Sequence, residues 1–305
     1  MQYRRRLQGR LFWRTAQSTQ KGKTMEKKIL RVFPHKTSYT PDEKDPYVYI
    51  ANGLCQVPAL ALFPEFDEVH ISCVFTWDRE FCQKLQWQFR GFTDKPVKLG
   101  GPAFRSYTPD FTPGLYVREG VTFTSRGCNN NCPWCMVPSV EGKLKELPIT
   151  PGNIIQDNNF LQTSRAHKDK VFEMLQDQRR ICFKGGLEAD LIDDHFIEHV
   201  KAIKPRIKEL WMACDTPGSL KAFQTACEKL RAAGFSRDKI KCYVLINGDL
   251  EENEKRLAEV YNVGAMPFAQ LYREYSGKKT TYSKEIEKFA RSWQRPPAIE
   301  AHMKH

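Results

Sequence analysis

Three cysteines lie within eight residues of this 305-residue sequence, as Cys128, Cys132 and Cys135 in the run CNNNCPWC. Spacers of three and two residues let the three sulfurs turn toward one point, so this loop can hold a metal centre. A closed structural zinc site needs four ligands, and no fourth cysteine or histidine stands nearby, the next histidine along being His167. Three thiolates on a cubane iron–sulfur cluster leave one iron open, whereas most [4Fe–4S] electron carriers use four cysteines. The missing fourth ligand therefore favours a cluster with an open iron over a zinc site.

The segments that must position these cysteines alternate between strand-like and helical patterns from Val121 onward. The strand-like runs are 121–125, 153–156, 180–183, 208–214, 239–246 and 265–272, and the helical patterns between them are 168–178, 193–203, 219–234 and 251–264. This alternation predicts parallel βα units joined by right-handed crossovers. Six units are fewer than the eight of a closed barrel. We therefore expect an α/β fold with a partial (βα)6 TIM-like barrel over residues 120–275, and the cysteines follow its first strand, where such folds place their chemistry.

The cysteines have a Cx3Cx2C spacing, an aromatic residue stands before the last of them, and they follow the first of six predicted strands. This pattern resembles the signature of the radical SAM superfamily. Its pattern is closest to the methylthiotransferase-like and cobalamin-linked branches of that family. The resemblance implies that Cys128, Cys132 and Cys135 hold one [4Fe–4S] cluster whose open iron chelates S-adenosylmethionine. An electron from the cluster, supplied by an external flavodoxin- or ferredoxin-like donor, would release a 5′-deoxyadenosyl radical that abstracts hydrogen from a substrate. Trp134 is implied to lie by the adenine; alternatively, its ring only packs the loop.

The same resemblance points to contacts with the cofactor or substrate at the ends of the later strands. Asp157 and Asn158 follow the second strand, where many family members carry a Gly-Gly-Glu run that this sequence lacks. A polar cap on the next helix is the alternative role for this pair. Gly185, Gly186 and Glu188 after the third strand are further candidates, with a plain turn as the alternative. The later strands add Asp215 and Thr216 after the fourth, Asn247 after the fifth, and Gln270, Tyr272 and Arg273 after the sixth; a solvated surface position is the alternative for Arg273.

Residues 29–105 precede this core and carry a small α/β pattern of their own, and 106–119, rich in proline and turn formers, form the expected linker. The 29–105 unit loosely resembles the cobalamin-binding domain found before some radical SAM cores. The Asp-x-His-x-x-Gly loop that ligates cobalt is absent, and neither His35 nor His70 has that context. We therefore expect a degenerate Rossmann-like or substrate-facing domain without cobalamin. A C-terminal helix and tail are expected over 276–305.

The formal net charge of +12 is concentrated at the N-terminus, because residues 1–28 contain nine Arg and Lys against one Glu. This segment is expected to be a basic, disordered extension, upstream of a second possible start at Met25; a transit peptide and a nucleic-acid-binding arm are alternatives. If the cysteines held zinc, a non-catalytic metal module binding nucleic acid through this arm would be the alternative function. The sequence contains no apolar run long enough to span a membrane.

Seven further cysteines are scattered singly, several inside apolar runs. Because no secretory signal accompanies them, we expect reduced, buried thiols and a cytoplasmic location. Their lack of paired spacing predicts a single cluster. RNA modification is one possibility for the substrate, and a peptide or a small metabolite is another; the sequence does not identify it.

Overall fold

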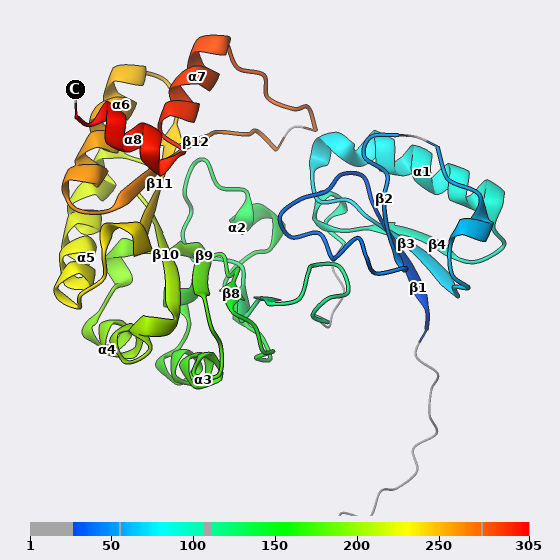
Figure 1. The fold of residues 1–305 in the computed structure, drawn as a ribbon, viewed down its shortest axis with the longest axis horizontal. Coiled ribbons are helices and arrows are strands. Elements are labelled where there is room, and N and C mark those ends of the chain that lie inside the picture. The colour runs from blue at the N-terminus through cyan, green and yellow to red at the C-terminus, as the bar shows by residue number, and fades with distance from the viewer. Residues whose placement is uncertain (1–26, 55, 107–110, 276, 305) are drawn as a thin grey trace, which may run out of the picture.

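The computed structural model describes residues 27–54, 56–106, 111–275 and 277–304. It contains a six-stranded and a four-stranded sheet, both parallel, and a two-stranded antiparallel hairpin (Figure 1). Helices flank both parallel sheets. The α/β fold class predicted from the sequence is confirmed.

The strands of the large sheet follow one another in chain order, each parallel to the next. They are β5 (Val121–Thr122), β8 (Ile154–Ile155), β9 (Ile181–Leu187), β10 (Ile207–Ala213), β11 (Ile240–Ile246) and β12 (Met266–Leu271). Within the described ranges, β5 and β12 form the two edges and do not pair with each other. The sheet is therefore open, as expected for a partial barrel.

Four helices return the chain between successive strands of this sheet. They are α3 (Arg165–Leu175), α4 (Asp194–Ala202), α5 (Leu220–Ala232) and α6 (Leu250–Asn262), each within three residues of the range predicted for it. Ser164, Asp193 and Asp249 accept a hydrogen bond from a backbone N–H in the first turn of α3, α4 and α6. These side chains supply hydrogen-bond acceptors for N–H groups of the first turn, which have no partner within the helix.

Alternation along the central strands separates the two faces of the large sheet. On one face, Phe183, Met212 and Val244 are buried in a core shared with the helices. On the other face, Glu209 accepts hydrogen bonds from Lys184 Nζ at 2.7 Å and from Trp211 Nε1 at 2.8 Å. Burial opposes the ionisation of Glu209, but these two hydrogen bonds hold its pKa at about 2. The face of the large sheet opposite this core therefore contains a charged and aromatic layer.

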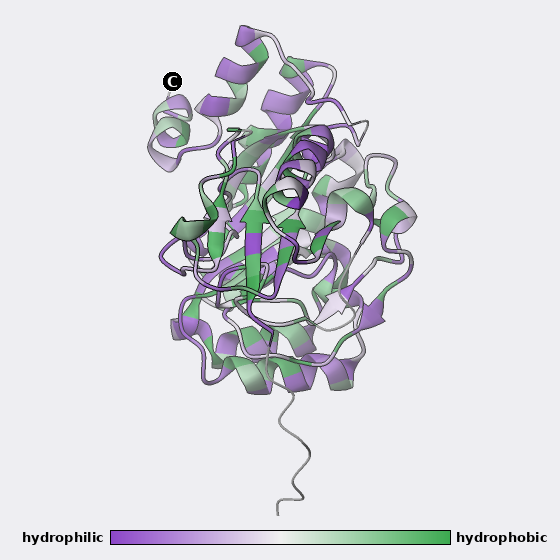
Figure 2. Cartoon of the chain, turned by 90° about the vertical axis from the view of Figure 1, so that its right-hand side faces the viewer, coloured by the Kyte–Doolittle hydropathy of each residue, from purple (hydrophilic) through white to green (hydrophobic). Residues whose placement is uncertain are grey.

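The small sheet has the spatial order β2 (Val48–Ile50), β1 (Ile29–Phe33), β3 (Glu68–Ser72) and β4 (Val97–Gly100). This 2-1-3-4 order is that of doubly wound sheets, with the topological switch between β1 and β3. Helix α1 (Arg79–Phe92) connects β3 to β4, and its buried residues include Leu85 and Phe89. In Figure 2 the helices carry both hydrophilic and hydrophobic residues, as expected for elements with one buried and one exposed face. Among the described residues, no α-helix joins β1 to β2 or β2 to β3, so the unit is a shortened Rossmann-like sheet.

The C-terminal region differs from the prediction. The single helix expected near the C-terminus is two helices, α7 (Lys284–Ser292) and α8 (Pro296–His302). Proline cannot continue a helix but fits the first turn of a new one, which explains why α8 starts at Pro296.

The predicted basic extension lies outside the described residues except for Lys27 and Lys28. No helix of the described chain has the length and apolar character needed to cross a bilayer. Six of the seven scattered cysteines are buried free thiols, as predicted, and the seventh, Cys55, lies outside the described residues.

Candidate functional site

The three cysteines occupy a loop between the two strands of the hairpin, β6 (Ser125–Arg126) and β7 (Lys145–Glu146). Gly127 opens the loop with φ +80°, and a Cβ there would lie 2.3 Å from the carbonyl oxygen of Lys143. Only glycine fits this close approach. The loop also contains the short helix α2 (Val137–Val140) and returns next to its start, where Cys128 N–H donates to the carbonyl of Gly142 at 3.1 Å.

The three cysteines of this loop are all at least partly accessible to solvent. Cys132 and Cys135 are exposed and Cys128 is half-buried. Partial burial raises the pKa of Cys132 and of Cys135, and the negative charge of the neighbouring thiolates raises both further. The charges of Cys128 and Cys135 both contribute to the raised pKa of Cys132, so the three thiols lie near one another in the loop.

Asp157 anchors the start of this loop. Its carboxylate accepts hydrogen bonds from Thr124 N–H at 2.6 Å, Thr124 Oγ1 at 2.6 Å and Ser125 Oγ at 2.8 Å, and the residue is only 1% exposed. Burial raises the pKa of Asp157, and these hydrogen bonds oppose the shift. The helix cap weighed as the alternative for Asp157 belongs instead to Ser164. The carboxylate of Asp157 thus fixes the strand that leads into the cysteines.

Two amides behind the cysteines form a network that the sequence did not reveal. Asn159 Nδ2 lies 3.8 Å from Cys128 Sγ and donates to Glu188 Oε2 at 2.6 Å. Gln162 Nε2 donates to the same carboxylate oxygen at 3.0 Å and to Asn130 Oδ1 at 2.9 Å. Glu188, a predicted cofactor contact, is therefore tied to the cysteine loop through these two amides. Asn159 directly follows Asp157 and Asn158, the two residues predicted from the sequence to contact the cofactor or substrate.

Glu141 is a second carboxylate that sequence reasoning missed. It accepts hydrogen bonds from Arg126 at 2.6 Å, from the N–H of Gly127 at 3.2 Å and from the predicted contact Asn158 at 2.6 Å. It therefore ties the return of the loop to β6 and to the end of β8.

The two glycines after the third predicted strand differ in their surroundings. A Cβ on Gly185 would lie 1.7 Å from the carbonyl oxygen of Asp157, so this glycine permits close packing of β9 against the end of β8. Gly186 has φ +118°, and the nearest atom to a Cβ there would be the carbonyl oxygen of Asn158, at 4.0 Å. Gly186 therefore leaves open space beside the site, whereas the space beside Gly185 is filled by protein.

Of the candidates after the fourth and fifth strands, Asp215 lies near the cysteine loop, whereas Thr216 and Asn247 have structural roles. Burial raises the pKa of Asp215, its Oδ1 accepts from Leu245 N–H at 3.1 Å, and its charge contributes to the raised pKa of Cys132. Thr216 caps the 3-10 turn Pro217–Ser219. The carbonyl of Asn247 accepts a hydrogen bond from Asn253, which connects Asn247 to α6.

A run of aromatic rings and an arginine leads from the cysteine loop to the small domain. Trp134, 46% exposed, has its ring centroid 6.0 Å from that of Tyr272 after β12. The next residue, Arg273, lies 5.6 Å from the ring of Trp77 in the small domain, and Trp77 stacks on Phe75 at 4.6 Å. The candidates Tyr272 and Arg273 are thus positioned near the cysteine loop, whereas Gln270 is exposed on β12. This run gives the site an aromatic wall contributed by both domains.

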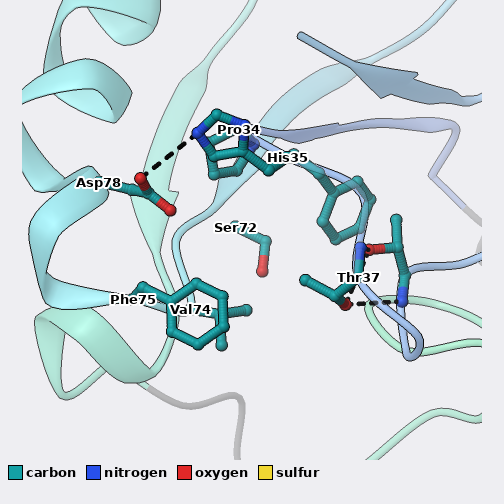
Figure 3. A pocket seen from close by; sticks show the side chains of 9 residues that line it. Pro34, His35, Thr37, Ser72, Val74, Phe75 and Asp78 are labelled. Atoms are coloured by element: carbon teal, nitrogen blue, oxygen red, sulfur yellow. Dashed lines mark hydrogen bonds and ion pairs between the residues drawn. The ribbon is translucent and has the colours of Figure 1, made fainter. Parts of the chain in front are cut away.

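A hollow lies at the carboxyl ends of β1 and β3, at the topological switch of the small sheet (Figure 3). His35, Thr37, Ser72, Phe75 and Asp78 contribute to its lining. Asp78 Oδ1 lies 3.5 Å from His35 Nε2. The hollow has a cavity volume of only about 10 Å³, far below the roughly 300–1,000 Å³ of ordinary ligand pockets. It stands where doubly wound folds bind ligands, but it is narrow.

Comparison with known proteins gives one partial match among curated proteins. Over 100 residues the chain is 33% identical to the ribosomal protein uS12 methylthiotransferase RimO of a Nitratiruptor species. The matched segment is 32% of this chain and spans only about a fifth, 22%, of the relative's length. No family model and no solved structure matches the chain. The similarity is thus to an enzyme, and it is partial.

Proposed function

We propose that this chain is a radical SAM enzyme in which Cys128, Cys132 and Cys135 hold one [4Fe–4S] cluster. When bound, the cluster supplies the electron that cleaves S-adenosylmethionine to methionine and a 5′-deoxyadenosyl radical. One observation carries the proposal: three accessible thiols share a loop at the carboxyl end of the first strand of an open, six-stranded parallel sheet. The partial match to a methylthiotransferase agrees with the branch of the family that the sequence resembles most.

The donor set of three thiols fits a cluster better than a closed zinc site, because structural zinc needs a fourth ligand. In a cubane cluster each thiolate binds a different iron, and three thiolates leave one iron open. Thiols with raised pKa values are protonated at neutral pH, and metal binding would displace these protons. The side-chain amide of Asn159 points at Cys128 Sγ. Hydrogen bonds to cysteine sulfur are one of the means by which proteins set the reduction potential of an iron–sulfur cluster.

The remaining side chains suit the handling of an S-adenosylmethionine-sized ligand. Gly186 exposes backbone at the end of β9, and the partly buried Asp215 provides a carboxylate near Cys132. Trp134 offers an exposed ring face of the kind on which an adenine stacks. In this arrangement the loop binds the cofactor, and the aromatic wall toward the small domain excludes water and faces the substrate.

The substrate class is open between protein and RNA. The relative's name makes a ribosomal protein one candidate, and the basic segment 1–28 makes RNA another. We expect no cobalamin in the small domain, since the sequence lacks the cobalt-ligating loop. A flavodoxin- or ferredoxin-like protein of the same reducing compartment, which we expect to be the cytoplasm, would supply the electron.

The test is cleavage of S-adenosylmethionine by the anaerobically reconstituted chain. Iron, sulfide, dithionite and S-adenosylmethionine are added, and 5′-deoxyadenosine is measured by chromatography for the wild type and for Cys132→Ala. The exposed Cys132 can lose its sulfur without disturbing the core, so both proteins should fold. The proposal expects product from the wild type alone. Absence of product from both, or equal product from both, would contradict it.

The alternative is a non-catalytic zinc module. Zinc that is retained at one ion per chain and is lost in Cys132→Ala, with no iron in the anaerobically purified protein, would favour that alternative.

A further inference from the structure

A second group of metal-ligating side chains lies on the helices that cover the large sheet. His195 and His199 stand four residues apart on α4, a spacing that places both on one helix face. Asp169 of the neighbouring helix α3 approaches both of them. Its Oδ1 lies 2.7 Å from His195 Nε2 and 2.8 Å from His199 Nε2, and the two Nε2 atoms are 3.2 Å apart. Three ligand atoms from two helices thus meet at one point.

These separations are close to those of ligands around one transition-metal ion. Tetrahedral zinc with bonds of about 2.0–2.1 Å places neighbouring ligand atoms roughly 3.3 Å apart. The two histidine nitrogens already have that separation. The carboxylate oxygen must move outward by roughly 0.5 Å to match it. Asp169 can do this, because its side chain is half exposed.

The two imidazoles are held in place by packing. The His199 ring lies parallel to the buried Phe172, with centroids 4.5 Å apart and an interplanar angle of 4°. The His195 side chain is only 14% exposed, and its ring meets that of His199 edge to face at 4.6 Å. Pre-positioned ligands lose little conformational freedom when a metal binds. The pair therefore presents both Nε2 atoms toward Asp169 before any ion arrives.

The surroundings of His195 limit the metal affinity that we expect for this group. Metal-binding histidines usually donate their second ring N–H to an acceptor, and loss of that support weakens binding about 10–100-fold. His195 Nδ1 is buried without a hydrogen-bond partner. With three ligands and this unsupported ring, we expect dissociation constants on the order of micromolar, weaker than those of closed structural zinc sites.

We propose that Asp169, His195 and His199 form a surface site for a divalent transition metal such as zinc, independent of the cysteine loop. Imidazole and carboxylate ligands suit zinc and its neighbours in the first transition series. Three protein ligands leave at least one coordination position for water or for a group from another molecule. Bound metal would tie α3 to α4.

The test is titration with cobalt(II), whose visible spectrum reports its ligands, followed by displacement with zinc. The full-length chain with Cys128, Cys132 and Cys135 all replaced by alanine serves as background, so that the loop thiols cannot bind the ion. The proposal expects one cobalt per chain, a spectrum without sulfur-to-cobalt charge transfer, and a rise in melting temperature on adding metal. In that background, His199→Ala and Asp169→Ala should each weaken cobalt binding at least about tenfold and abolish the temperature rise.

His302→Ala is the matched control, because His302 Nε2 lies 2.8 Å from Glu254 on another helix pair, and no third ligand among the described residues joins them. Its cobalt affinity should equal that of the background protein. No binding at millimolar cobalt, or binding unchanged in Asp169→Ala, would overturn the proposal. If His199→Ala fails to fold because the stacking on Phe172 is lost, the half-exposed Asp169→Ala decides alone.

Discussion

Replacement of Gly185 by alanine should disrupt both the stability of the large sheet and the cysteine site. A Cβ at this position would lie 1.7 Å from the carbonyl oxygen of Asp157, 2.7 Å from its carbonyl carbon and 2.9 Å from its nitrogen. To move the first contact from 1.7 Å to 3.0 Å, the two backbones must part by about 1.3 Å. No flexible side chain can relieve this clash, because all three atoms belong to the backbone.

The expected cost has two parts. Overpacking of a well-packed site typically costs about 1–3 kcal/mol. A shift of Asp157 by this distance also breaks at least one of the three hydrogen bonds that Thr124 and Ser125 donate to its carboxylate, and a hydrogen bond to a charged group is worth about 1.5–3 kcal/mol. The free energy of unfolding should therefore fall by about 2.5–6 kcal/mol. Iron retained after reconstitution should fall as well, because Asp157 fixes the strand that enters the cysteine loop.

Urea unfolding and iron content should be measured together for Gly185→Ala and for Gly218→Ala. Gly218 is the control, since the nearest atom to a Cβ there is Thr216 Oγ1 at 3.9 Å. Alanine is tolerated at such positions and should change stability by less than about 1 kcal/mol. A Gly185→Ala protein that matches the control in both measurements would refute this reasoning.

Two further substitutions test the aromatic wall at Trp134 and the charged face of the large sheet at Glu209. Trp134→Ala should retain iron, because the Trp134 ring is 46% exposed. Loss of stacking should weaken the binding of S-adenosylmethionine to the reconstituted protein roughly tenfold. A Kd that calorimetry finds unchanged would contradict a role for Trp134 at the adenine. Glu209→Gln should lower stability at neutral pH by about 3 kcal/mol, because the native pKa is about 2 and the ordinary value is 4.5. A lowered carboxylate pKa stabilises the fold above pH about 4.5, and this contribution is lost as the pH falls toward about 2. The free energy of unfolding of the variant, measured in urea, should therefore change less than that of the wild type between these two pH values. The exposed Glu65→Gln should retain the wild-type profile.

The order of the large sheet was predictable because its signals are local. Apolar, β-branched strands such as Ile240–Ile246 alternate with amphipathic helices at regular spacing, and parallel units of this kind pair with their chain neighbours. The cysteine triplet was equally visible, since its three members lie within eight residues of one another. The three-residue strand β2 and the two-residue strands of the hairpin are too short to leave a periodic signal.

The contacts behind the cysteines depend on tertiary structure and could not be predicted. Asn159 and Glu188 are 29 positions apart and meet only because β8 and β9 are neighbours. Likewise, the sequence places a carboxylate at Asp157 but does not show that Thr124 and Ser125 donate to it. The break before Pro296 was readable in principle, because proline rarely continues a helix.

The most direct test of the central claim is the metal content of the anaerobically purified chain and of Cys132→Ala, measured side by side. A single [4Fe–4S] cluster on three loop cysteines predicts about four iron and four sulfide per chain in the wild type and a large loss of both in the variant. Iron near eight per chain, iron that is unaffected by the loss of Cys132, or no iron in either protein would contradict the account.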